Sequence, residues 1–133
     1  MARSSTYFVL YWLFSCSLVA AEPAQLRFEG QTRFFSVVVE SQLKPIVINQ
    51  MHAWSVRLTW PDGLPIEDAV IDVAGGMPAH NHGLPSSPRV TEYLGDGTYL
   101  IEGMKFHMPG KWRLVLTVKA QGKVDNISIP ISV

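Results

Sequence analysis

Apolar and polar residues alternate in short runs along much of the chain, which is the pattern of β-strands with one buried face. Three runs place their apolar side chains on a single face: Trp54, Val56, Leu58 and Trp60; Trp112, Leu114, Leu116 and Val118; and Ile127, Ile129 and Ile131. No apolar stripe of helical spacing and useful length follows residue 33. The pattern therefore predicts an all-β domain.

Further short runs lie between turn-forming residues. β-branched and aromatic residues predict strands at 34–40 and 69–73. A shorter strand is predicted at 45–49, where the leading proline confines it to a sheet edge. Gly75-Gly76 is expected to end the strand that begins at residue 69.

A hairpin is predicted where residues 89–94 and 98–106 flank Gly95-Asp96-Gly97, because these turn residues tolerate a positive φ. In the second of these strands the apolar side chains change parity after Ile101, so a bulge at Glu102-Gly103 would restore one apolar face. The chain then has seven or eight strands, as expected for an immunoglobulin-like β-sandwich.

The N-terminus carries the pattern of a secretory signal. An uncharged apolar run follows Arg3 and precedes Ala20-Ala21. We predict a signal peptide at 1–21, an irregular lead-in at 22–33 and one β-sandwich domain at 34–133.

Two alternatives remain open for the signal segment. One is retention as an uncleaved membrane anchor, although the apolar run is shorter than the ~18 residues expected of a spanning helix. The other is lipidation of Cys16, because Leu13-Phe14-Ser15-Cys16 loosely resembles a bacterial lipobox, in which Phe14 fits poorly. All three interpretations place the domain in the periplasm or otherwise export it.

Charge and motif content narrow the function. The formal net charge is zero, with 11 basic and 11 acidic side chains, so no nucleic-acid footprint or attraction to an anionic membrane is predicted. Cleavage after residue 21 would remove the only cysteine, which excludes a disulfide or a thiolate metal site within the remaining chain. No nucleophile elbow, glycine-rich phosphate loop or H-E-x-x-H motif occurs, and we predict that the protein is not an enzyme.

All four histidines are predicted at one end of the sandwich. Short connections make successive strands antiparallel, so strand ends can be placed by counting reversals. His52 begins one strand, His80 and His82 follow the end of the next, and His107 follows the second strand of the hairpin. The count places all of them at the same end.

Histidine and methionine without thiolate predict a copper site, with zinc as the second choice. Imidazole suits both metals, and thioether sulfur favours Cu(I). The lack of closely spaced carboxylates argues against calcium and magnesium. We predict His80, His82 and His107 as ligands, Met77 as a soft ligand, and His52 as a ligand or as a residue that orients one.

Simpler explanations exist for the same residues. His80 and His82 lie between proline and glycine and could be exposed turn residues. Met51, Met104 and Met108 are assigned to packing, as are the tryptophans of the predicted strands. The alternative function is an envelope interaction or structural module without metal, whose polar end loops contact another envelope protein.

Four blocks of sequence, at 49–54, 75–85, 95–99 and 106–112, occur in an order that resembles the YtkA-like domain family and its relatives, the FixH-like domains. The resemblance covers roughly residues 45–118. It implies an exported, immunoglobulin-like bacterial module, some of whose relatives are associated with copper handling, and it implies no established reaction. The expected partners are the metal ion and an envelope protein that donates or receives it.

Overall fold

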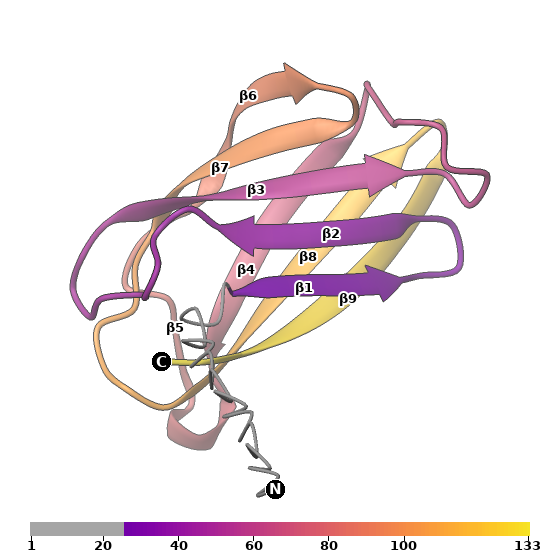
Figure 1. Ribbon diagram of the computed structural model, residues 1–133. Helices are drawn as coiled ribbons and strands as arrows, with labels where there is room; N and C mark the ends of the chain where they lie inside the picture. Colours follow the sequence, from indigo (N-terminus) through magenta and orange to yellow (C-terminus); the bar gives the residue numbers. More distant parts are fainter. Residues whose placement is uncertain (1–25) are drawn as a thin grey trace, which may run out of the picture.

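Two antiparallel sheets face each other in the computed structural model, which describes residues 26–133 (Figure 1). The first sheet has the order β1-β2-β3-β7-β6 and contains Arg27–Gln31 (β1), Ser36–Ser41 (β2), His52–Thr59 (β3), Thr98–Met104 (β7) and Arg89–Gly95 (β6). The second has the order β5-β4-β8-β9 and contains His82–Gly83 (β5), Val70–Met77 (β4), Lys111–Ala120 (β8) and Lys123–Ser132 (β9). A short 3₁₀ helix, Pro78–His80 (η1), joins β4 to β5. The predicted all-β sandwich is confirmed.

The predicted signal peptide and Cys16 lie outside the described residues. Within residues 26–133, no helix is long and apolar enough to cross a membrane.

The alternating apolar residues form the core between the two sheets. Its buried members from β3, β8 and β9 are those that the alternation predicts: Trp54, Val56, Leu58, Trp112, Leu114, Leu116, Val118, Ile127, Ile129 and Ile131. Trp60, at the end of the first run, is only partly buried and packs on Phe35, with 5.6 Å between the ring centroids. The two sheets therefore bury the faces that period-two alternation assigns to them.

The predicted bulge in β7 is confirmed. Trp54 pairs with Ile101 and His52 pairs with Met104. A step of two residues along β3 therefore faces a step of three residues along β7, which defines the bulge. Gly103 takes up the extra residue with a φ of +86°, a conformation that suits glycine. The bulge returns Met104 to the buried face, where Ile101 also lies.

Two expectations for the first half of the domain are wrong. The lead-in at 22–33 is not irregular throughout, because β1 lies within it and pairs with β2 from Arg27↔Glu40 to Gln31↔Ser36. Residues 45–49 form no strand. Their backbone follows the neighbouring loop instead, since the amide of Asn49, at a φ of +64°, donates to the carbonyl of Phe106 over 2.8 Å.

Two further expectations also need correction. β4 does not end at Gly75-Gly76 but continues to Met77, because its pairing with β8 extends to Gly76↔Arg113. Met51 is not a packing residue, since its side chain is 57% exposed. Met104 and Met108 do pack on the core as expected.

The Tyr99→Phe variant is expected to lose about 1–3 kcal/mol of unfolding free energy, because one buried and one partly buried backbone group would lose a partner. The Tyr99 hydroxyl donates to the carbonyl of Ile66 over 2.7 Å and accepts from the amide of Ala69 over 2.9 Å. Urea denaturation measures the loss. The matched control is Tyr93→Phe, because the Tyr93 side chain is 39% exposed and its hydroxyl has one backbone partner among the described residues, the Gly97 amide, instead of two. Equal losses in both variants would contradict the anchoring role of Tyr99.

Candidate metal centre

Four chain reversals bring the histidine-bearing segments to one end of the sandwich (Figure 1). β3 begins at this end, β4 and β7 finish there, and β8 begins there. The end is formed by residues 42–52, 77–88 and 104–113, and we name it the histidine pole.

His82 lies between two other histidines at this pole. Its ring centroid is 5.0 Å from that of His107 and 5.9 Å from that of His80, onto which it stacks. Trp112 supports the pair from the core, with its ring 5.5 Å from His82 and 5.4 Å from His107. His80 is exposed, whereas His82 and His107 are partly buried. His82 is therefore the centre of the histidine cluster.

His52 belongs to the same pole but lies deeper. Its ring is 5.7 Å from Phe106, and Phe106 is in turn 5.2 Å from Trp112. These aromatic rings lie between His52 and the cluster around His82 and His107. The structure therefore brings together three of the four predicted histidines and places His52 one layer beneath them.

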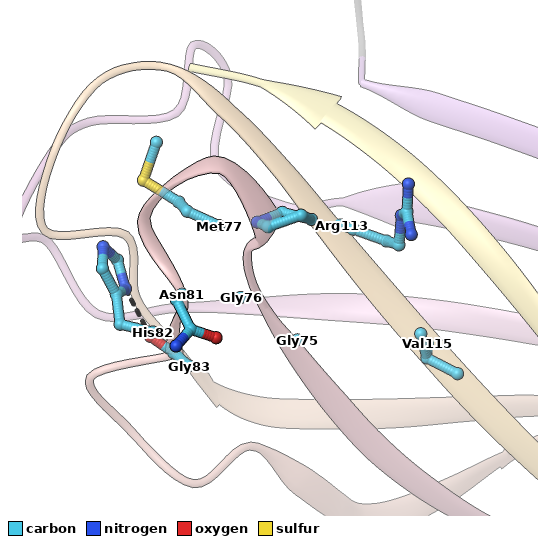
Figure 2. A pocket seen from close by; sticks show the side chains of 9 residues that line it. Gly75, Gly76, Met77, Asn81, His82, Gly83, Arg113 and Val115 are labelled. Atoms are coloured by element: carbon cyan, nitrogen blue, oxygen red, sulfur yellow. Dashed lines mark hydrogen bonds between the residues drawn. The ribbon is translucent and has the colours of Figure 1, made fainter.

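Met77 is the methionine that pairs with a histidine of this cluster across the sheet. It ends β4 directly opposite His82 of β5, and directly opposed residues in an antiparallel pair share a face with Cβ atoms about 4.5–5.5 Å apart. Figure 2 shows the two side chains leaving the backbone on the same side, away from Arg113 and Val115. Both residues line an open hollow of about 400 Å³. The Met77 side chain is only 2% exposed.

A sequence model of the YtkA-like family matches residues 33–117. The chain belongs to the YtkA-like family. The match spans β2 to most of β8, so the family region of this YtkA-like domain contains all four histidines and Met77 and omits β1 and β9. Neither the curated proteins nor the solved structures compared with the chain give a match. The relation to FixH-like domains stays a prediction.

Hydrogen bonds fix which imidazole nitrogens of the YtkA-like domain are free. Nδ1 of His82 lies 3.1 Å from the carbonyl of Gly83, and a carbonyl only accepts, so Nδ1 carries the hydrogen and, in the neutral imidazole, Nε2 keeps its lone pair. Nδ1 of His107 is buried and has no hydrogen-bond partner among the described residues. The contacting pair of rings thus includes a free lone pair and an unsatisfied nitrogen.

The described residues contain no ready-made centre of three or more His, Cys, Asp or Glu side chains. Nitrogen ligands of one ion lie at most about 4 Å apart, because each metal–nitrogen bond is about 2 Å long. The ring contacts run from His80 to His82 and from His82 to His107. The ring contacts therefore join the imidazoles in pairs and do not gather three or four of them around one point.

Sequence reasoning assigned Trp112 to the core but missed its contact with both imidazoles. The signal was present, because Trp112 begins the inward-facing series of β8 at the same end as His107. The Nε1 group of Trp112 donates to the carbonyl of Met108 over 3.1 Å, which fixes the indole beneath the cluster. Counting strand reversals places Trp112 at the same end as the histidines, so the same count applied to buried aromatic residues predicts this contact.

The apo YtkA-like domain is expected to lose stability below about pH 6.5 through His52. Burial lowers the pKa of His52, and the hydrogen bond from its Nδ1 to the Gln50 carbonyl opposes this shift in part. The unfolded chain therefore binds more protons than the native one as pH falls through the ordinary histidine value of about 6.5, and the stability present above that pH decreases.

Urea midpoints measured with a chelator between about pH 7 and pH 5 test this effect, because histidine titrates in that range. The His52→Phe variant removes the titrating group while keeping a ring beside Trp54 and Phe106. We expect a flatter pH dependence in the variant. The same slope in both proteins would show that another group is responsible.

Proposed function

We propose that this YtkA-like protein is exported and binds copper as cargo at the histidine pole, without catalysing a reaction. His82, His107 and Met77 are the central donors, and His80 adds an imidazole from the exposed side. His52 supports the cluster from below. The observation that carries the proposal is the ring contact between His82 and His107, with Met77 directly opposite His82.

The chemistry of this donor set fits Cu(I) better than zinc. Structural zinc sites have four ligands in a closed tetrahedral shell, usually with thiolates, whereas thioether sulfur is a soft ligand that selects Cu(I). Two imidazoles and one thioether match the second description. A bound ion would also relieve the cost of the unpartnered, buried Nδ1 of His107.

The position of the cluster supports release as well as binding. His80 is exposed and stacks on His82, so a competing ligand can reach the cluster from solvent. The hollow beside Met77 and His82 is also open. Loops at the end of a rigid sandwich are a common place for such exchangeable sites. These features support delivery of copper to another envelope protein.

Titration of the purified protein with Cu(I), Cu(II) and Zn(II) tests the proposal. We expect one Cu(I) per chain with a Kd below about 1 μM, which is about −8 kcal/mol of binding free energy. Tryptophan fluorescence should change on binding because Trp112 contacts both imidazoles, and the Met77 methyl resonance should shift. Failure of all three ions to bind tighter than about micromolar would favour the alternative, an envelope interaction module without metal.

A further inference from the structure

Unpaired cations surround the histidine pole. Lys105, Lys111 and Arg113 have no carboxylate within ion-pair distance among residues 26–133. Lys111 and Arg113 are exposed, and Arg113 borders the hollow that His82 also lines (Figure 2). The fourth cation of the pole, Lys44, is paired with Glu40 at 2.9 Å.

The three segments named as the histidine pole contain no acidic residue, and Glu40 and Glu102 flank them. Residues 42–52, 77–88 and 104–113 carry these four cations and four histidines, with no aspartate or glutamate. At the opposite end, the β3–β4 connection at 60–69 and the turn at 96–97 carry Asp62, Glu67, Asp68 and Asp96, while the two other turns of that end carry Arg33 and Lys123. The opposite end therefore mixes both signs of charge, whereas the three segments of the histidine pole carry cations alone.

Apolar side chains are exposed beside the unpaired cations. Val47 is 45% exposed and Met51 is 57% exposed, both in the loop between β2 and β3. That loop is tied to the β7–β8 loop, which contains Lys105, by the hydrogen bond from the Asn49 amide to the Phe106 carbonyl. Cationic and apolar side chains thus lie on adjoining loops. Protein interfaces commonly have such an arrangement, with an apolar centre and a polar rim.

We propose that the histidine pole is the docking surface for a protein partner whose own face is acidic around a small apolar centre. Opposite charges steer the encounter and set the orientation, while like charges reject other partners. Docking here would bring the partner against His80 and His82, the exposed side of the proposed copper site.

A protein surface fits these features better than a nucleic acid. Binding to nucleic acid relies on neutralising many phosphates and is typical of strongly basic domains. This chain is neutral overall and has only three unpaired cations at the pole. The exposed Val47 and Met51 would remain unused against phosphate but would be buried against an apolar centre on a protein.

The test uses the full protein without metal and a synthetic peptide of glutamate flanking leucine, with a glutamine-for-glutamate peptide as the matched probe. Amide chemical shifts report where each peptide binds. We expect the acidic peptide to shift resonances of residues 42–52 and 104–113, and the glutamine peptide to bind at least roughly tenfold more weakly. Raising the salt concentration should weaken the acidic complex, because the Debye length falls from about 10 Å at 0.1 M to about 3 Å at 1 M.

Lys111→Glu and Lys123→Glu form a matched pair of variants. Both lysines are exposed and begin adjacent antiparallel strands, so Lys111 lies at the histidine pole and Lys123 at the opposite end. Lys111→Glu should weaken peptide binding roughly tenfold, since it converts an attraction into a repulsion, and Lys123→Glu should not. Equal effects of the two variants, shifts spread over both ends, undetectable binding of the acidic peptide, or equal competition by inorganic phosphate would overturn the proposal.

The docking surface and the copper site can be tested separately. The His82→Ala variant removes the central imidazole but none of the unpaired cations, so it should still bind the acidic peptide. Lys111→Glu should keep the copper affinity of the unsubstituted protein. Loss of copper binding with retained docking would reject only the proposed function, and the converse would reject only the docking surface.

Discussion

Replacing His82 by alanine is expected to reduce Cu(I) affinity by about 100-fold or more. Even the outer partners of metal ligands typically contribute 10–100-fold to affinity, and His82 is the central donor of the proposed site. Its ring contacts those of His80 and His107, and its Nε2 is free because Nδ1 donates to Gly83. Without it, the remaining histidines are not in contact with one another among the ring pairs observed. Competition titration with a Cu(I) chelator measures the change.

His80→Ala is the matched control for this experiment. It removes the same chemical group two residues earlier, from an exposed position at the end of η1. We expect a loss of about tenfold or less for Cu(I) and a larger loss for Cu(II), which lacks the preference for thioether and depends more on imidazole. Equal losses of Cu(I) affinity in the two variants would show that His82 has no central role, and no loss in either would place the site elsewhere.

Strand parity explains why most of the fold was predictable. Alternation assigned Trp54 and Trp112 to the core, and the change of parity after Ile101 located the bulge at Gly103, because side chains in a strand alternate with a period of two. The same logic fails in loops. The path of residues 45–49 depends on a long-range hydrogen bond from Asn49 to Phe106, which no local pattern encodes.

The candidate site shows the same division between what is local and what is not. Counting reversals from the sequence placed the four histidines at one end, since it needs only the direction of each strand. It could not place Phe106 and Trp112 between His52 and the other histidines, because that depends on how side chains pack. It also could not show that Met77 pairs with His82, since β5 has only two residues and forms only against β4.

The pairing of β5 with β4 depends on a glycine. At Gly76, an added Cβ would lie 2.3 Å from the carbonyl oxygen of His82, closer than any side chain can tolerate. Only glycine therefore allows β5 to lie against this end of β4. Because His82 is in β5 and Met77 follows Gly76 directly, the close approach of the two backbones also sets the distance between the proposed imidazole and thioether donors.

Gly76→Ala is accordingly expected to weaken Cu(I) binding at least about tenfold without removing any donor, because metal and binding sites need their groups held within about 0.5 Å. The displaced strand should also reduce the unfolding free energy by about 1–3 kcal/mol, the usual cost of overpacking. Gly83→Ala is the matched control: its Cβ would meet the Gly75 carbonyl oxygen at 3.5 Å, an ordinary contact, and its stability should change by no more than about 0.5 kcal/mol. Urea denaturation and Cu(I) competition titration of both variants separate the two effects. If Gly76→Ala lost stability but bound Cu(I) as tightly as the unsubstituted protein, the position of β5 would not control the site, and the pairing of Met77 with His82 would have no part in metal binding.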